Sequence, residues 1–355
     1  MPTPQESSMS STIDQSRRYI RQSIFAPIGK SGQDQIGAAR VVLVGCGALG
    51  SAIADQLVRS GIGSIRLIDR DFVEIHNLQR QSLYSEDDVE RRTPKALAAY
   101  ERLSRVNSQI KIEPVVDDLT SGNVDRLLRG FNLIVDGTDN FETRYLINDY
   151  AVANDRPWIY GGVIGSYGMT MTIRPGITAC MRCVFPEAPP PGTAPTCDTA
   201  GVIAPIVQII ASYEVAEALK YFVGAIDKLN PGLLAVDVWN LSVDTIPTGG
   251  PNPDCPTCGH RDFTYLNAPP DDRETVLCGQ DSVQVRLANP VSIDLDQLAK
   301  RLSGAGDVVR SKFLLRFTDA ATDRELTVFP DGRAIIRGTT DGEEAKRLYA
   351  AYVGI

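Results

Sequence analysis

A glycine-rich loop in this chain is followed by side chains that could bind a nucleotide. Its glycines are Gly45, Gly47 and Gly50, between a β-type segment at 40–44 and a helical segment at 51–60. In such a loop the first glycine makes a tight turn, the second lets backbone approach a ligand, and the third lets helix and strand pack closely. The loop amides and the helix N-terminus attract anionic groups. This pattern indicates a nucleotide site, and a plain strand-to-helix turn is the alternative.

The residues after the second predicted strand, 64–69, decide which nucleotide is favoured. Asp69 ends that strand and can accept hydrogen bonds from ribose hydroxyls, which fits a nicotinamide dehydrogenase as well as an ATP-using enzyme. A dehydrogenase also needs an apolar slot, whereas a triphosphate needs cations and amides to neutralise it. The chain supplies the latter in Asn77, Arg80, Gln81 and Lys95, and Asp71 in the same run is a further candidate for the nucleotide site. The whole run favours ATP, although a solvated charged loop is the alternative for any one of these residues.

Four of the seven cysteines form two Cys-x-x-Cys pairs, Cys180 with Cys183 and Cys255 with Cys258. In a chain without an export signal this spacing favours a metal over disulfides, and a redox disulfide is the alternative for each pair. Four thiolates fill a tetrahedral zinc ion, so we expect a structural zinc site without a catalytic role. With only two histidines, mechanisms that need a histidine base are weakened.

Composition excludes some classes of partner. The 355 residues are 43% hydrophobic and 23% charged, as in an ordinary globular protein, and nothing calls for a membrane. The formal net charge is -8 and no dense Lys/Arg run occurs, so we expect no nucleic-acid partner. Residues 1–16 are polar and have no apolar segment of the kind a signal peptide needs, which predicts a disordered tail on a cytoplasmic protein.

Strand and helix patterns alternate through the first two thirds of the chain, which predicts an α/β fold with a doubly wound, Rossmann-like sheet. The proline-rich segment 186–195 should be a surface loop, because it cannot continue a helix or central strand. The predicted strands are 40–44, 64–69, 111–116, 131–135 and 158–161, and the predicted helices are 51–60, 95–106, 144–154 and 204–222.

The C-terminal part should form a separate small α+β domain, residues 281–355, after a linker at 267–280. The preceding domain, 17–266, would then hold the nucleotide site and the zinc site. Within the small domain, Asp331-Gly332 signals a hairpin turn, and Thr340 with Glu343 matches a capping box. We identify no internal repeats.

Several motifs occur in the order typical of the MoeB/ThiF/HesA family, the bacterial relatives of ubiquitin-activating enzymes, which the chain resembles from about Tyr19 to Gly259. They are Arg18-Tyr-Ile-Arg21-Gln22, the glycine loop, Asp69-x-Asp71, Asn77-Leu-Gln-Arg80-Gln81, Pro94-Lys95, Asp136-Gly-Thr-Asp139-Asn140, both cysteine pairs and Thr196-Cys197-Asp-Thr-Ala-Gly201-Val. The resemblance covers some two thirds of the chain.

The resemblance implies a role for each matching residue. Asp69 would hold the ribose, while Asn77, Arg80 and Lys95 would contact the phosphates. Asp139 would hold Mg²⁺ or position the incoming carboxylate. The remaining implied roles fall to two residues: Arg21 would reach into a neighbouring subunit's ATP site, which implies a homodimer, and Cys197 would form a thioester or acyl persulfide, as in some relatives.

The implied activity is adenylylation. The C-terminal carboxylate of a ubiquitin-like sulfur carrier ending in Gly-Gly would attack the α-phosphorus of ATP, for sulfur transfer in molybdopterin or thiamin biosynthesis. A nucleotide-binding scaffold without catalysis and a tRNA-modifying dehydratase are the alternatives. Two positions depart from the family pattern: Arg92 stands where relatives often have glycine, and Glu214 where many have glutamine. The C-terminal domain lacks the cysteine-headed loop of a rhodanese.

Overall fold

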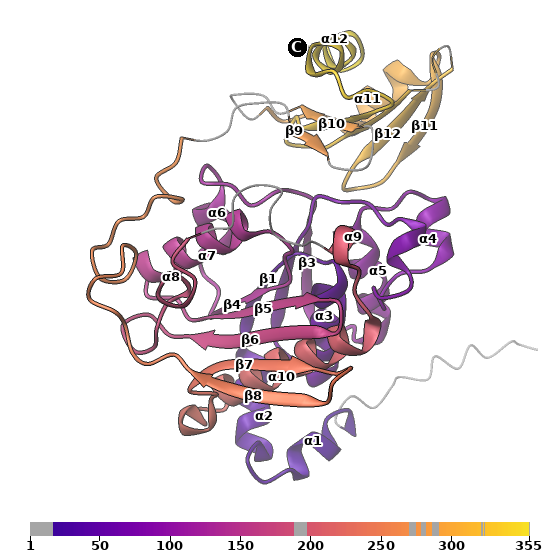
Figure 1. Cartoon of the computed structure of the whole chain (residues 1–355). Coiled ribbons are helices and arrows are strands. Elements are labelled where there is room, and N and C mark those ends of the chain that lie inside the picture. The colour runs from indigo at the N-terminus through magenta and orange to yellow at the C-terminus, as the bar shows by residue number, and fades with distance from the viewer. Residues whose placement is uncertain are drawn as a thin grey trace, which may run out of the picture. The chain divides into compact units, whose positions relative to one another are not determined.

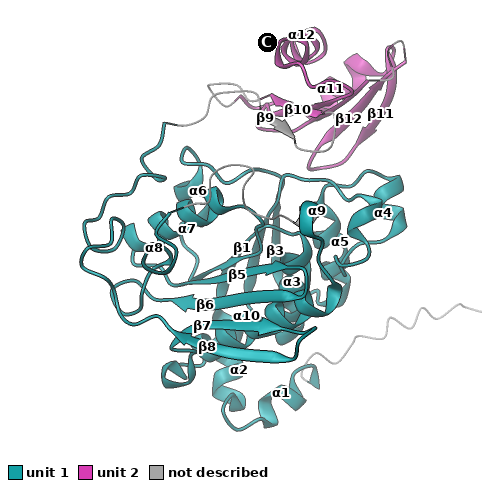
Figure 2. Cartoon of the chain, viewed as in Figure 1, with its two compact units in different colours: residues 1–269 teal, residues 270–355 magenta. Residues whose placement is uncertain are grey.

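The structure is a computed structural model that describes residues 17–187, 197–269, 275–277, 282–285, 291–320, 322 and 324–354. The chain divides into two compact units, residues 1–269 and 270–355 (Figure 2). The division falls within the segment 267–280 that the sequence suggests as a linker. The expected N-terminal tail and most of the proline-rich loop lie outside the described residues.

The first unit is built on an eight-stranded sheet with the order β3-β2-β1-β4-β5-β6-β7-β8 (Figure 1). The first five strands along the chain are parallel, and the last three are antiparallel. Their bounds are β1 Arg40–Val44, β2 Ser64–Ile68, β3 Lys111–Val115, β4 Leu133–Asp136, β5 Trp158–Ile164, β6 Tyr167–Ile173, β7 Gly232–Asp237 and β8 Ser242–Pro247.

Helices cover both faces of this sheet. Alternate residues of β1 enter different cores: Leu43 packs in the cluster that holds α3 (Ala48–Ser60), α5 (Lys95–Val106) and α10 (Ala204–Phe222). Val44, on the opposite face, packs with α6 (Val124–Leu128) and α7 (Phe141–Ala153). Because both faces are buried, β1 reads as a continuous apolar run. The prediction of a doubly wound α/β sheet dominated by parallel strands is therefore confirmed.

The remaining helices of this unit are short or peripheral. Figure 1 shows α1 beside α2 at one end of the sheet. Their bounds are α1 Ile20–Ile24, α2 Gly29–Ala38, α4 Glu86–Glu90, α8 Met181–Val184 and α9 Cys197–Ala200, with 3₁₀ turns η2 at Ile75–Asn77 and η3 at Ile226–Lys228. No described helix has both the length and the apolar character needed to cross a membrane.

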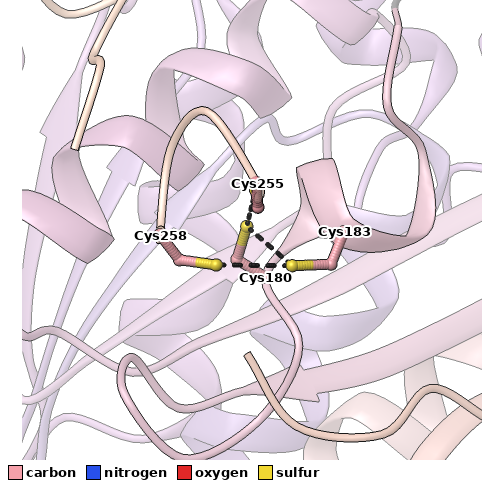
Figure 3. A group of neighbouring side chains, drawn as sticks. All are labelled: Cys180, Cys183, Cys255 and Cys258. Atoms are coloured by element: carbon pink, nitrogen blue, oxygen red, sulfur yellow. Dashed lines mark hydrogen bonds between the residues drawn. The ribbon is translucent and has the colours of Figure 1, made fainter. Parts of the chain in front are cut away.

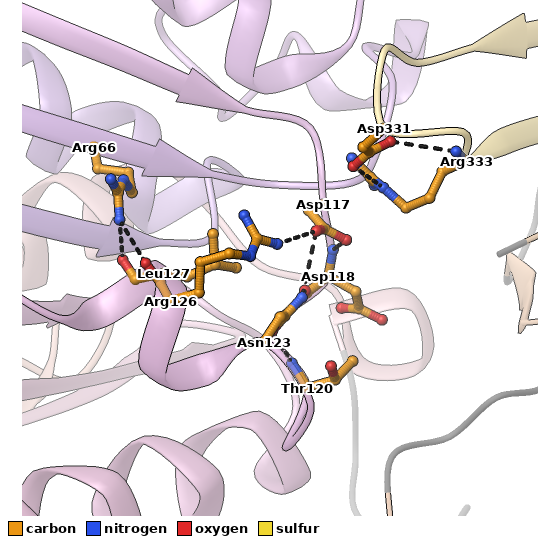
Figure 4. A network of polar contacts seen from close by, with 9 residues as sticks. All are labelled: Arg66, Asp117, Asp118, Thr120, Asn123, Arg126, Leu127, Asp331 and Arg333. Atoms are coloured by element: carbon orange, nitrogen blue, oxygen red, sulfur yellow. Dashed lines mark hydrogen bonds and ion pairs between the residues drawn. The ribbon is translucent and has the colours of Figure 1, made fainter. Parts of the chain in front are cut away.

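A polar turn after β3 begins α6 (Figure 4). Asn123 accepts a hydrogen bond from the backbone N–H of Thr120 at 2.8 Å and donates to Asp117 at 3.3 Å. The buried Asp117 carboxylate also pairs with Arg126 at 3.4 Å. The turn thus satisfies a buried charge where the chain leaves the sheet.

The second unit is a six-stranded antiparallel sheet with the order β11-β12-β13-β14-β10-β9 and two helices. Leucine, valine and isoleucine side chains of the sheet pack with both helices around Phe317 and Tyr349. The bounds are β9 Thr275–Leu277, β10 Ser282–Val285, α11 Leu295–Leu302, β11 Gly306–Arg310, β12 Leu315–Asp319, β13 Glu325–Val328, β14 Ala334–Arg337 and α12 Gly342–Tyr352.

Two local predictions in this unit have different outcomes. The turn at Asp331-Gly332 joins β13 to β14, with Gly332 at φ +85° and Asp331 accepting from Arg333 Nε at 2.7 Å (Figure 4). The prediction of a capping box at Thr340 is wrong. The N-cap of α12 is Asp341, whose carboxylate accepts from two backbone N–H groups of the first turn and fits the helix dipole better than a hydroxyl.

Candidate functional site

The glycine loop connects β1 to α3, and two of its positions accept only glycine. Gly45 has φ +88°, and its N–H donates to the carbonyl of Ile68 on β2 at 2.8 Å. A Cβ added to Gly50 would lie 1.9 Å from the Gly45 oxygen, so no side chain fits there. Gly47 is the N-cap of the 13-residue α3, which leaves the loop amides directed at the site where an anion would bind.

Asp69 fixes the loop from the end of β2. Its carboxylate accepts hydrogen bonds from the backbone N–H of Cys46 and of Asp71, each at 2.7 Å. Burial raises the pKa of Asp69 to about 6, and the nearby Lys95 acts in the opposite direction. Each carboxylate oxygen keeps a second lone pair, so ribose hydroxyls could still donate to Asp69.

Lys95 is buried at the start of α5 and is held by the loop after β2. Its Nζ lies 2.9 Å from Asp71 Oδ2, and its backbone N–H donates to the Asp71 carbonyl at 2.8 Å. Burial alone would lower the pKa of Lys95, but Asp69, Asp71 and, more weakly, Asp139 raise it above its ordinary value. The ammonium therefore stays charged beside three carboxylates, where it can bridge to phosphate oxygens.

The turn from Glu74 to Gln81 orients two further candidates. Asn77 is buried, and its Oδ1 accepts from the Glu74 N–H at 3.0 Å, so it also shapes this turn. Arg80 donates to the His76 carbonyl at 2.9 Å and has no ion-pair partner among the described residues. Gln81 is 3% exposed, and its Oε1 has no hydrogen-bond partner within the described chain.

Gln81 also indicates that a polar ligand fits here. Its Nε2 would be 3.9 Å from a Cβ at Gly47, so the side chain lies against the glycine loop. A buried oxygen without a partner costs free energy, which a ligand donor at this position would recover. The site thus combines the first amides of α3, a guanidinium without an ion-pair partner in the described chain and a buried amide oxygen without a donor, a set of groups that suits a nucleotide triphosphate.

Asp139 stands on the loop after β4, which packs directly on the glycine loop. A Cβ at Gly137 would lie 2.6 Å from the Gly45 oxygen, so the two loops are in backbone contact. Asp139 is exposed and precedes Asn140, the N-cap of α7, whose side chain accepts from Thr143 N–H at 2.8 Å. The carboxylate is therefore available to a cation or a ligand beside the glycine loop.

Arg21 lies at the far end of α3 from this site. The neighbouring Gln22 donates to the carbonyl of Ser60, and the Tyr19 ring fills the space beside Gly61. Both contacts are at the C-terminal end of α3, whereas the glycine loop precedes its first residue, about 20 Å away for 13 residues. Arg21 is exposed and cannot reach the glycine loop of its own chain.

Cys197 begins α9, and its side chain lies outside the described residues. The segment after α9 is tied to the turn between β5 and β6. Gly165 donates to the Gly201 carbonyl at 2.8 Å and accepts from the Ile203 N–H at 3.0 Å. The catalytic role expected of Cys197 stays a prediction.

The two cysteine pairs meet in one cluster (Figure 3). Sγ–Sγ distances are 3.8 Å for Cys180 to Cys183, 3.6 Å for Cys180 to Cys255 and 3.3 Å for Cys183 to Cys258. A tetrahedral ion with Zn–S bonds of about 2.3 Å places its sulfurs roughly 3.8 Å apart. The four sulfurs lie within 4.8 Å of one another, so the cluster could hold a zinc ion and offers no position for a substrate.

Helix α7 braces this cluster. Asn148 accepts from the Met181 N–H at 2.9 Å, beside the first cysteine pair. Asp149 accepts from the Thr257 hydroxyl at 3.0 Å, within the second pair, and from the Tyr265 N–H at 2.8 Å. The cluster is therefore held in place by partners outside the cysteines themselves.

Comparison with known proteins places the chain in a family. The model of the ThiF family matches residues 19–257. The chain belongs to the ThiF family. It is 43% identical over 339 residues to the sulfur carrier protein ThiS adenylyltransferase of Bacillus subtilis (strain 168), covering 95% of this chain and 99% of the relative. It is 39% identical to the sulfur carrier protein adenylyltransferase of Thermus thermophilus, over 70% of this chain and 92% of the relative.

More distant members extend the comparison. The adenylyltransferase and sulfurtransferase MOCS3 of Sus scrofa is 33% identical over 73% of this chain, which spans 56% of that relative. Among solved structures, E. coli MccB crystallised with AMPCPP and MccA superposes with a TM-score of 0.60 at 25% identity. That match covers 69% of this chain and 75% of the other. These relatives share the ThiF fold of the first unit.

The sequence did not point to every residue that shapes this ThiF-family site. Tyr84, which is buried, donates to the Cys46 carbonyl at 2.6 Å and so holds the glycine loop together with Asp69, which accepts from the Cys46 N–H. Arg144 and Asp149 lie on α7 and bind Asp136 and Thr257 respectively, yet the sequence showed them only as parts of an amphipathic stretch. Their function depends on long-range contacts, which no local pattern records.

Proposed function

We propose that this protein uses ATP to adenylylate the C-terminal carboxylate of a ubiquitin-like sulfur-carrier protein ending in Gly-Gly. It would serve sulfur transfer in thiamin or molybdopterin biosynthesis. The observation that carries the proposal is the 43% identity across 99% of a relative named for adenylylation of the carrier ThiS. The geometry supports it, because cationic and amide groups meet at the glycine loop.

The residues would divide the work as follows. Asp69 holds the ribose, and the amides of Gly47 to Gly50, at the N-terminus of α3, approach the phosphates. Lys95 and Arg80 neutralise the triphosphate as the carrier carboxylate attacks the α-phosphorus and pyrophosphate leaves. Bringing these anions together is the main barrier, and oriented cations lower it without a histidine base.

Asp139 completes the site. Its exposed carboxylate stands within electrostatic range of Lys95, beside the glycine loop. Mg²⁺, when bound, would supply positive charge to the phosphates, and Asp139 would hold it. Asn77 supports this arrangement by fixing the turn and Asp71 by fixing Lys95, while the buried Gln81 oxygen would accept a hydrogen bond from the ligand.

We infer that the active protein is a homodimer in which Arg21 enters the ATP site of the partner subunit. Two observations support this. Arg21 is about 20 Å from its own glycine loop, and the apolar residues around it are exposed, Ile24 at 66% and Phe25 at 59%. Such an exposed apolar helix is typical of a surface that a partner covers.

We also propose that the cysteine cluster holds a structural Zn²⁺, that Cys197 receives the activated carrier, and that the second unit, which contains residues 281–355 and also β9 from the segment expected to be a linker, is an accessory domain. The sulfur distances support the zinc ion. The cytoplasmic location stays a prediction.

The test is pyrophosphate exchange into ATP with and without a purified Gly-Gly-ending carrier. Exchange that depends on the carrier, together with a carrier mass increased by AMP, is the expected result. ATP binding without exchange for any candidate carrier would overturn the proposal in favour of a nucleotide-binding scaffold. Carriers of the thiamin and molybdopterin pathways, compared at equal concentration, decide which one is preferred. A carrier whose terminal glycine is deleted provides the matched control.

A further inference from the structure

A buried arginine lies directly behind the loop that carries Asp139. Arg144, on the first turn of α7, is 6% exposed, and its Nε donates to Asp136 Oδ2 at 2.9 Å. Its Nη2 donates to the carbonyls of Thr138 at 2.6 Å and Gly161 at 2.8 Å. One guanidinium therefore connects α7, the loop after β4 and the neighbouring strand β5.

The same network fixes the residue before Asp139. The other oxygen of Asp136 accepts from the Thr138 N–H at 2.8 Å and from its hydroxyl at 2.7 Å. With its carbonyl bound to Arg144, every polar group of Thr138 has a partner. The preceding Gly137 is pressed against the glycine loop. The distance between Asp139 and the nucleotide loop therefore depends on the Asp136–Arg144 pair.

We propose that Arg144 is a positioning residue for adenylyl transfer: it holds the loop that carries Asp139 against the glycine loop. The guanidinium fork is needed because three acceptors in different directions must be bound at once, which a lysine ammonium on a flexible stem does less well. The consequence for the reaction rests on the proposed function, whereas the effect on the loop does not.

A second carboxyl in this network serves as a built-in control. Glu214 of α10 is fully buried, and neither of its oxygens has a hydrogen-bond partner in the described part of the chain. It packs against β5, where a Cβ at Gly161 would lie 2.1 Å from Glu214 Oε1. Burial and the nearby Asp136 raise the pKa of Glu214 well above its ordinary value, and Arg144 offsets this only in part. Full burial without a hydrogen-bond partner favours the neutral form of Glu214, whereas Asp136 is the carboxylate that pairs with Arg144.

The experiment compares Arg144→Lys with Glu214→Gln, which keeps the shape and neutral charge of its side chain. Both variants are first checked for thermal unfolding and for metal content. Arg144→Lys should lower kcat for carrier-dependent pyrophosphate exchange by about 10²-fold, with a much smaller change in KM for ATP, because a misplaced group acts mainly in the transition state. Glu214→Gln should leave both parameters within about twofold of the native protein.

Coupling to Asp139 separates positioning from general destabilisation. If Arg144 acts through Asp139, the double variant Arg144→Lys/Asp139→Asn should be no slower than Asp139→Asn alone. Hydrogen exchange of residues 137–140 should increase in Arg144→Lys, while protection in the central strands is unchanged. Additive losses in the double variant, or unchanged exchange in that loop, would overturn the proposal. Were the native protein inactive with every carrier, the proposed function would fail, and hydrogen exchange would still decide whether Arg144 positions the loop.

Discussion

Mixing two inactive variants should restore activity if Arg21 acts in the partner's site. Arg21→Ala removes the arginine that each subunit gives away, and Lys95→Ala removes the lysine that each subunit keeps. In a heterodimer, one site then has both residues intact and the other has lost both. The roughly 20 Å between Arg21 and its own glycine loop makes this arrangement a geometric requirement.

The magnitude follows from counting sites. Random reassociation of equal amounts makes about half of the dimers heterodimeric, and one of their two sites is intact, so about a quarter of all sites recover. Each parent should retain less than about 1% of native activity, since a cation that stabilises the transferring phosphoryl group is worth about 10²-fold or more. The expected recovery is therefore far above either parent.

The assay is carrier-dependent pyrophosphate exchange after co-expression of differently tagged subunits, with the heterodimer fraction measured by native mass spectrometry. The matched control mixes Lys95→Ala with Asp139→Ala. Both residues belong to the same pocket, so no heterodimer site is intact and nothing should recover. Confirmed heterodimers without recovery, or equal recovery in the control, would refute the shared site.

Four further predictions concern the support of the site. Gly50→Ala should lower the free energy of unfolding by at least about 2 kcal/mol and abolish ATP binding in calorimetry, because the added Cβ would lie 1.9 Å from a backbone oxygen. Gly37→Ala is the control: a Cβ there meets nothing nearer than 4.0 Å, so neither the free energy of unfolding nor ATP binding should fall in this way. Asp149→Ala should weaken zinc binding roughly tenfold in chelator competition, since it removes the bracing of the second cysteine pair; unchanged affinity would contradict this. Arg92→Gly should raise the free energy of unfolding by up to about 1 kcal/mol in urea titrations, because the backbone φ of Arg92 is +47°, which glycine adopts without strain. A lower free energy of unfolding in this variant would show that the backbone of Arg92 is not strained. Burial raises the pKa of Asp69 to about 6, so the folded state binds this proton more tightly than the unfolded state does. The free energy of unfolding should therefore fall by at most about 3 kcal/mol as pH rises from about 4 to about 6, and Asp69→Asn should flatten this slope in pH-dependent denaturation.

Local sequence patterns were sufficient for much of the fold. The predicted strand 40–44 and helices 95–106 and 204–222 match the bounds of the elements in the structure. Each has a strong period or a clear terminal signal, which nearest neighbours along the chain provide. In contrast, β6, β7 and β8 were not predicted, and every residue of β8 is exposed, so it carries no core-facing alternation to read.

The site shows the same division. The types and order of Asp69, Arg80, Lys95 and Asp139 are written in the sequence, because nucleotide chemistry demands particular groups after particular strands. The spacing of the four cysteines likewise indicated a metal site. What the sequence could not supply is how far Arg21 lies from its own pocket, or that Arg144 binds three separate elements.

The chain by itself thus determined which chemical groups are available and the α/β order of the elements, since both depend on residue identity and local periodicity. Only the tertiary structure decided which of those groups meet. Contacts such as Gly137 on Gly45 or Arg144 on Gly161 join segments far apart in sequence, and their distances are set by how the sheet brings strand ends together. Buried partners of this kind leave no local pattern, because a buried arginine on a helix looks the same in sequence as a solvated one.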